Sequence, residues 1–127
     1  MTYQFDHIHL RSPDPQTAAR FYVDMFEAES LGTIETERGI RAIIKLGGQT
    51  VFIEQVPPDT AVPPPPPYVG IEHLGLRVSR LDEVVARLKA KGVKFVVEPR
   101  QPKPGLRIAF LEGPDKVRIE LLERGTA

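Results

Sequence analysis

The stretch Phe5-Asp6-His7-Ile8-His9-Leu10-Arg11 returns 66 residues later as Ile71-Glu72-His73-Leu74-Gly75-Leu76-Arg77, since 73 − 7 = 66. The same offset, carried along the chain without a gap, finds further matches: Gly39 with Gly105, Arg41 with Arg107, Gly47 with Gly113, Val51 with Val117, Ile53 with Ile119 and Glu54 with Glu120. The chain is therefore a tandem duplication, and a fold with pseudo-twofold symmetry would bring His7, His73, Glu54 and Glu120 together. Two imidazoles and two carboxylates are ligands for a divalent ion, so the repeat predicts a metal site.

The composition limits the partners and ligands of the chain. Seventeen basic and seventeen acidic residues among 127 give a formal net charge of zero, which argues against a nucleic-acid partner. Because cysteine is absent, disulfides and thiolate ligands are excluded, and nitrogen and oxygen must hold any metal. The stretch Met1–Asp6 lacks the pattern of a signal peptide, and no segment is apolar enough to span a bilayer. We therefore expect a cytoplasmic protein that does not contact membranes.

The first half of the chain has the pattern of one strand, one helix and three further strands. Apolar and polar residues alternate from Tyr3 to Arg11, which predicts a strand whose polar face lines a cavity with His7, His9 and Arg11. Asp14 is a good helix cap, and apolar residues follow at helical spacing: Ala18, Phe21, Tyr22 and Met25. Extended runs at 30–37, 40–46 and 50–56 complete a βαβββ module over residues 1–56.

A Pro-rich linker is expected at 57–70, followed by a second βαβββ module at 71–127. Five consecutive prolines, Pro63–Pro67, favour a stiff polyproline II rod. Beyond it we expect a strand at 71–78, a helix that ends at Gly92, and strands near 94–98, 106–111 and 117–122. The helix carries one apolar face, formed by Leu81, Val84, Val85 and Leu88. The fold class is therefore α+β, with two tandem modules.

This arrangement resembles the vicinal oxygen chelate superfamily, which includes glyoxalase I, bleomycin resistance proteins and extradiol dioxygenases. The resemblance is carried by Phe5–Leu10, by Phe21-Tyr22 and by the stretch 113–121, and it covers almost the whole chain apart from the linker. It implies two modules with mixed sheets that curl into half-open barrels. It also implies a ligand set from first and last strands, namely His7, Glu54, His73 and Glu120.

Within that superfamily, the His/Glu/His/Glu order is most similar to bacterial glyoxalase I. Methylmalonyl-CoA epimerases carry Gln at the position that matches Glu54, and the dioxygenases and fosfomycin resistance enzymes resemble a two-His, one-Glu pattern. Arg11 also matches an arginine four residues after the first histidine of glyoxalase I. The chain departs from glyoxalase I at Pro57-Pro58, where an asparagine for glutathione is usual, and at Met25–Ala28, where a Leu-Gly pair is usual. The resemblance therefore does not carry glutathione over as a co-substrate.

The chemistry implied is proton transfer next to a carbonyl or hydroxyl group, through an enediolate. One divalent ion per site, Ni²⁺ or Zn²⁺ with Co²⁺ and Mn²⁺ as alternatives, would hold two substrate oxygens, and Glu120 and Glu54 would move the proton. Proton return to the neighbouring carbon makes the enzyme a glyoxalase-like lyase or isomerase acting on a 2-oxo or 2-hydroxy, hemithioacetal-like substrate. Return to the same carbon makes an epimerase. The remaining alternative is a non-catalytic dimer that binds small molecules such as drugs, as in the bleomycin-resistance branch.

Four further side chains are candidates for substrate binding. They are His9, Arg11, Arg77 and Lys103. For His9 a merely solvated ring, and for the arginines ordinary salt bridges between strand ends, are the alternatives. Lys103 and Arg107 belong to or border a segment, 100–105, that resembles a lid, and a solvated loop is the simpler interpretation. The stiff linker disfavours folding back on the preceding module, so we expect a homodimer with metal sites at or near its interface.

Overall fold

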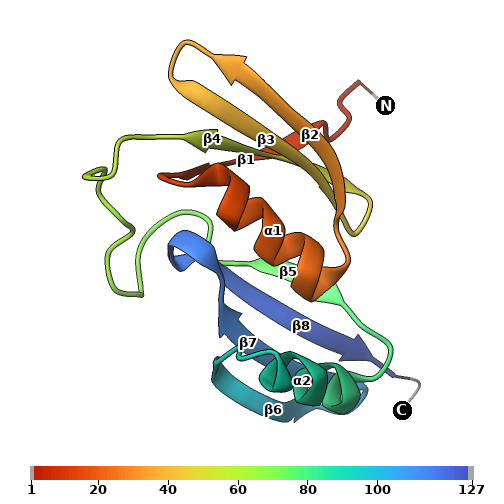
Figure 1. Ribbon diagram of the computed structural model, residues 1–127. Helices are drawn as coiled ribbons and strands as arrows, with labels where there is room; N and C mark the ends of the chain where they lie inside the picture. Colours follow the sequence, from red (N-terminus) through yellow and green to blue (C-terminus); the bar gives the residue numbers. More distant parts are fainter. Residues whose placement is uncertain (1, 126–127) are drawn as a thin grey trace. The chain divides into compact units, whose positions relative to one another are not determined.

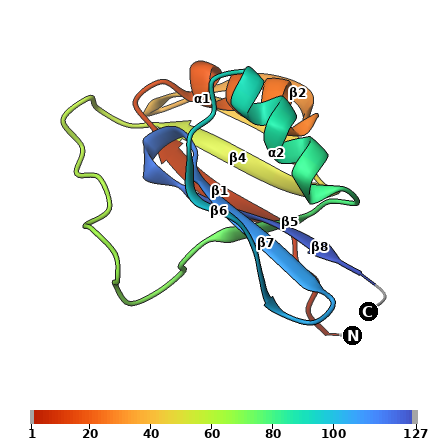
Figure 2. The same ribbon diagram turned by 90° about the horizontal axis from the view of Figure 1, so that it is seen from below.

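The computed structural model describes residues 2–125. The chain divides into two compact units, Met1–Val62 and Pro63–Ala127, and the division falls inside the Pro-rich segment 57–70. The segment between the units contains no helix or strand among its residues (Figure 2). Among the described residues, the helices are too short or too polar to cross a membrane.

The first unit is a four-stranded mixed sheet with one helix (Figure 1). The strand order is β1-β4-β3-β2, with β1 parallel to β4 and the other neighbours antiparallel. Among the described residues, β1 and β2 form the two edges of this sheet. The elements are β1 (His7–Ser12), α1 (Pro15–Phe26), β2 (Glu29–Thr36), β3 (Gly39–Leu46) and β4 (Gln49–Gln55).

Helix α1 begins and ends where local chemistry requires it. The Asp14 carboxylate accepts a hydrogen bond from the Thr17 backbone N–H at 3.2 Å and from the Thr17 hydroxyl at 2.7 Å, and Pro15 occupies the first turn. The helix ends at Glu27, whose backbone is left-handed (φ 57°, ψ 32°) and whose N–H donates to the Tyr22 carbonyl. Apolar side chains of α1 pack on one face of the sheet, and the buried ones include Ala18 and Tyr22.

The second unit repeats the architecture. Its sheet has the order β5-β8-β7-β6, again with the first strand parallel to the last. Leu81, Val85 and Leu88 of α2 are buried with the apolar side chains of β7 and β8. The elements are β5 (Leu74–Arg77), α2 (Leu81–Ala90), β6 (Phe95–Lys103), β7 (Leu106–Glu112), a short 3₁₀ turn (Pro114–Lys116) and β8 (Arg118–Arg124).

The βαβββ order, the two helices and the α+β class are confirmed, and two expectations were wrong. The first strand of each unit is shorter than its alternating sequence suggested, since β1 begins at His7 instead of Tyr3 and β5 at Leu74 instead of Ile71. The segment 100–105 is no lid or loop. Its residues through Lys103 belong to β6, which tolerates Pro99 and Pro102 because it is an edge strand.

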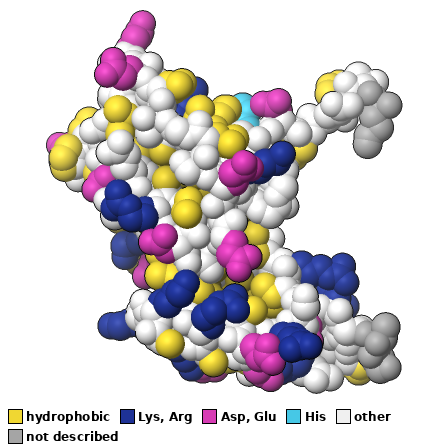
Figure 3. Space-filling model, turned by 45° about the vertical axis from the view of Figure 1, so that its right-hand side comes forward, with side chains coloured by type: hydrophobic (Ala, Val, Ile, Leu, Met, Phe, Trp, Pro, Cys, Tyr) yellow, Lys and Arg dark blue, Asp and Glu magenta, His cyan; other side chains and the backbone are white. Residues whose placement is uncertain are grey.

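The surface carries both signs of charge. Basic and acidic side chains are interspersed over the face seen in Figure 3, without a large area of one sign. This distribution agrees with a net charge of zero and gives no electrostatic footprint for a nucleic acid on that face.

Candidate metal centre

In the first unit, the candidate residues lie on the sheet face that points away from α1. Ile8 and Leu10 of β1 pair with Val51 and Ile53 of β4 and belong to the helix-covered side. The alternate residues of both strands therefore share the opposite face. Their cross-strand pairs are His7 with Thr50, His9 with Phe52 and Arg11 with Glu54.

The Glu54 carboxylate is the buried centre of this face. Glu54 is only 7% exposed, and its Oε1 lies 2.9 Å from His9 Nε2. Its Oε2 lies 3.5 Å from Arg41 Nη2, and the Arg41 guanidinium also sits 5.3 Å from the centroid of the Phe52 ring. Burial works against ionisation of Glu54, but the hydrogen bond with His9 and the charge of Arg41 outweigh it and hold the pKa of the carboxyl below its ordinary value.

His7 has different neighbours from His9. Its Nδ1 lies 2.7 Å from the carboxylate of Asp6, and its ring centroid lies 4.4 Å from that of Phe52. In the first unit, the histidine that contacts the buried carboxylate is therefore His9, although the sequence repeat pairs His7 with His73.

The second unit presents one histidine and one carboxylate on its corresponding face. His73 Nε2 lies 3.2 Å from Glu120 Oε1, and His73 Nδ1 is hydrogen-bonded to the carboxylate of Glu72. The His73 ring meets Phe110 edge-on at 5.1 Å between centroids. The guanidinium of Arg118 lies 4.5 Å from the centroid of the same Phe110 ring.

Arg41 and Arg118 are components of these faces that the sequence did not single out. On the strand next to the carboxylate, Arg41 is paired with Glu54 in the first unit, whereas Phe110 is paired with Glu120 in the second. Two residues before the glutamate on its own strand, the first unit has a phenylalanine, Phe52, and the second unit has an arginine, Arg118. Each unit thus holds an Arg–Phe contact, but with the two residues exchanged between strands. The ungapped repeat hid the exchange because it matches Arg41 with Arg107, which instead pairs with Asp82 at 2.7 Å.

The side chains of the other candidate residues make no contact with the two glutamates that the structure shows as a hydrogen bond or ion pair among the described residues. Arg11 and Arg77 lie on the same faces but have no hydrogen bond or ion pair within the described part of the chain, so the expected salt bridges between strand ends are not seen there. Lys103 lies at the exposed end of β6, where it pairs with Leu106 across a tight hairpin.

Each unit holds one histidine–carboxylate pair. Within residues 2–125, no group of three or more His, Asp or Glu side chains is gathered in a way that could hold an ion. What each unit does provide is one imidazole nitrogen beside one carboxylate oxygen, a donor pair that suits a divalent ion of intermediate softness. The donor chemistry of each pair fits a divalent metal.

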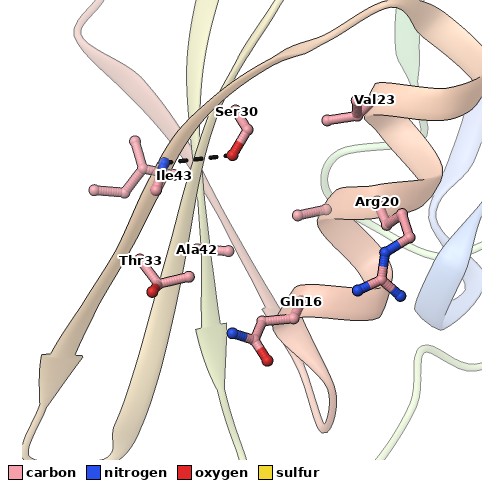
Figure 4. Close-up of a pocket in the computed structure, with 9 residues that line it drawn as sticks. Gln16, Arg20, Val23, Ser30, Thr33, Ala42 and Ile43 are labelled. Atoms are coloured by element: carbon pink, nitrogen blue, oxygen red, sulfur yellow. Dashed lines mark hydrogen bonds between the residues drawn. The ribbon is translucent and has the colours of Figure 1, made fainter.

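A pocket of the first unit lies elsewhere. It has a volume of about 360 Å³ and opens between α1 and the strands β2 and β3 (Figure 4). Its lining includes Gln16 and Arg20 of α1 and Ser30 and Thr33 of β2, and none of the candidate ligands. The pocket is therefore separate from the histidine–carboxylate pairs.

The sequence and the fold have clear relatives. Residues 4–121 match the family described as the Glyoxalase/Bleomycin resistance protein/Dioxygenase superfamily. The chain belongs to this superfamily. A relative from Arabidopsis thaliana, a probable chloroplastic lactoylglutathione lyase, is 31% identical over 123 residues, which are 94% of this chain and 35% of that protein. The chain thus spans about a third of the length of that relative.

Solved structures of superfamily members share the fold. A glyoxalase family protein from Enterococcus faecalis is 27% identical and superposes with a TM-score of 0.80, covering 96% of this chain and 98% of the other. The fosfomycin resistance protein FosX from Listeria monocytogenes, solved with Mn(II) and sulfate, is 21% identical, with a TM-score of 0.74 over 99% of this chain and 95% of the other. These likenesses agree with two tandem βαβββ modules of the glyoxalase-like fold.

Proposed function

We propose that the protein is a metal-dependent lyase or isomerase of the glyoxalase I type. The observation that carries this proposal is the presence, on the corresponding sheet face of each unit, of one imidazole Nε2 within 2.9 Å or 3.2 Å of a glutamate oxygen. Such pairs can become ligands of a divalent ion, because a neutral imidazole and a carboxylate are the forms that bind metal.

The two pairs together supply the ligands of one ion. Glu54, His73 and Glu120 are three of them, and the fourth is a histidine of β1, which the sequence repeat gives as His7. The pairs meet either within one chain or across a homodimer. Ni²⁺ and Zn²⁺ suit this donor set, as do Co²⁺ and Mn²⁺, and the Mn(II) in the Listeria protein of similar fold supports a divalent ion. When bound, the ion supplies Lewis-acid stabilisation of negative charge on substrate oxygens.

Glu120 is the better placed of the two carboxylates to move the proton. Glu54 is held from two sides, by His9 and by Arg41, and its pKa is lowered. Glu120 contacts His73, and the cross-strand neighbour of Glu120 on β5 is Gly75, which has no side chain to hold the carboxylate. A carboxylate with fewer fixed partners is freer to turn towards a carbon-bound proton, so Glu120 acts as the base and Glu54 chiefly as a ligand.

The substrate class is a small 2-oxo or 2-hydroxy compound of the hemithioacetal kind. The Arabidopsis relative named as a lactoylglutathione lyase supports this class. Arg11, Arg77 and Lys103 are candidates to hold an acidic group of the substrate. Because Pro57 and Pro58 follow the strand that carries Glu54, a thiol other than glutathione is included among the expected co-substrates.

The proposal is tested by metal content and by turnover. Protein purified without chelators or an affinity-tag metal is analysed for bound elements, then supplied with Ni²⁺, Zn²⁺, Co²⁺ or Mn²⁺ and assayed with hemithioacetals of methylglyoxal and several thiols. Glu120→Gln should lower turnover by at least ~100-fold, because it removes the base. Glu112→Gln, on an exposed strand end, is the control and should keep full activity.

The outcomes distinguish the alternatives. Turnover that depends on metal and on Glu120 supports the proposal. A product with the same constitution as its substrate would replace it with an epimerase. Failure to take up any of the four ions would refute both enzymes and leave a small-molecule binding protein.

A further inference from the structure

The two sheets differ in the register of their parallel strand pair. In the first unit, Leu10 of β1 is paired with Ile53 of β4. In the second unit, Leu74 of β5 is paired with Ile119 of β8, and Ile119 is the repeat equivalent of Ile53, since 119 − 53 = 66. The sequence repeat, with its offset of 66, matches Leu74 with Ile8. In strand pairing, however, Leu74 occupies the position that Leu10 has in the first unit, which is an offset of 74 − 10 = 64. The first strand has slipped by two residues between the units.

A slip of two residues changes which histidine stands beside the carboxylate without changing the face. Side chains alternate along a strand, so an even slip keeps every polar residue on the polar side. The residue before Leu74 is His73, and the residue before Leu10 is His9. By strand register, His9 is thus the counterpart of His73, although the ungapped sequence repeat assigns that role to His7.

The side-chain contacts agree with the register. His9 Nε2 lies 2.9 Å from Glu54, as His73 Nε2 lies 3.2 Å from Glu120. Exposure does not distinguish the three rings, since 32% of the His9 side chain, 31% of His73 and 35% of His7 is exposed.

His7 resembles His73 in two contacts, neither of which involves the glutamate. In both, Nδ1 contacts the acidic residue that precedes the histidine, Asp6 or Glu72. Each ring also lies near a phenylalanine, Phe52 for His7 at 4.4 Å and Phe110 for His73 at 5.1 Å between centroids. A neighbouring carboxylate orients a ring but does not bring its Nε2 to the glutamate.

We propose that His9, and not His7, is the first-unit histidine that joins Glu54 as a ligand of the divalent ion. The inference rests on the proposed function, because it assumes that the two pairs bind metal, and it changes one member of the ligand set. His7 then serves as a neighbour that covers Phe52.

The test compares metal affinity in matched variants. Co²⁺ binding is measured by titration calorimetry for the parent and for His7→Gln, His9→Gln and His73→Gln, with circular dichroism and melting curves as checks of folding. Loss of an orienting neighbour weakens metal binding by about 10–100-fold, so loss of a ligand should weaken it by at least ~100-fold in His9→Gln and in His73→Gln. In His7→Gln the affinity should stay within about threefold of the parent, because a ligand is not lost.

A second readout needs no altered site. The chain contains three histidines, so the unaltered protein labelled with ¹⁵N-histidine gives three sets of ring signals. The set that is missing from the spectrum of His7→Gln belongs to His7. Addition of Zn²⁺ should shift Nε2 of His9 and His73 and leave that of His7 in place.

The results that contradict the assignment are specific. Loss of Co²⁺ affinity in His7→Gln, whether alone or equal to that in His9→Gln, overturns it while the proposed function stands. Failure of the parent to bind Co²⁺, Ni²⁺, Zn²⁺ and Mn²⁺ overturns the proposed function and this assignment together.

Discussion

Replacing Glu27 with glycine should stabilise the protein. Glu27 ends α1 in the left-handed region, at φ 57° and ψ 32°, where its Cβ crowds the following carbonyl. That conformation costs a residue other than glycine about 1–2 kcal/mol. Glycine avoids this strain but loses about 0.5–1 kcal/mol more chain entropy on folding. Taking the middle of each range, about 1.5 − 0.75, the difference predicts a gain of about 0.75 kcal/mol, or roughly 2–4 °C in melting temperature for a chain of this size.

The assay is urea unfolding followed by circular dichroism, with melting curves in parallel. The midpoint should rise while the slope of free energy against urea stays constant, which marks a change in stability and not in the surface exposed. Glu27→Ala is the first control, because it removes the side chain but keeps the strain, and it should give no comparable gain. Gly92→Ala, which follows α2 at φ +93°, should destabilise by about 1–2 kcal/mol. A Glu27→Gly midpoint at or below that of the parent would refute the argument.

Three further predictions concern a helix cap, the core and the metal. Asp14→Ala should lower the melting temperature at pH 7. Hydrogen bonds from the Thr17 hydroxyl and N–H hold the pKa of Asp14 below its ordinary value. In the parent, the stability that Asp14 contributes is therefore fully present above about pH 4 and is lost as the pH falls through the lowered pKa. Melting curves from pH 7 to pH 2 would show this loss. Leu121→Ala should lower the unfolding free energy by about 3–5 kcal/mol in urea titrations, because the side chain is fully buried, whereas exposed Val96→Ala should change it by less than about 0.5 kcal/mol. If the protein binds a divalent ion only when folded, that ion at 100 times its dissociation constant should add about 2.7 kcal/mol of stability, and EDTA should reverse the rise in melting temperature.

The order of elements could be read from the sequence because it depends on local patterns. The helix of the first unit was predicted from Asp14 and its apolar spacing, and it begins and ends within a residue of that expectation. The strand that was expected from Tyr3 failed because alternation continues beyond the last paired residue. His7 already pairs with Thr50, near the start of β4, so Tyr3 and Phe5 have no strand beside them and are 85% and 74% exposed.

The residue types of the candidate site could be predicted from the sequence, but which of these side chains contact one another could not. Both glutamates and a histidine in each unit were found because duplication marks them. Strand register, in contrast, is set by contacts between distant segments, and a slip of two residues leaves the alternating pattern intact. The sequence therefore gave no signal that His9 instead of His7 contacts Glu54. The buried partner Arg41 was missed for the same reason, since its cross-strand position follows from the β3–β4 register.

The two halves of the duplication have diverged in charge at the site as well as in register. Arg41 puts a cation beside Glu54, whereas the residue paired with Glu120 is Phe110, and Arg118 makes its ion pair with Glu72 instead. A cation beside one carboxylate favours its ionised form and competes with a metal for its oxygens, while the other carboxylate lacks that restraint. The two pairs are therefore unequal in their surrounding charge, although their residues come from equivalent positions. In the proposed reaction, this inequality would let Glu54 hold its place as a ligand while Glu120 delivers the proton.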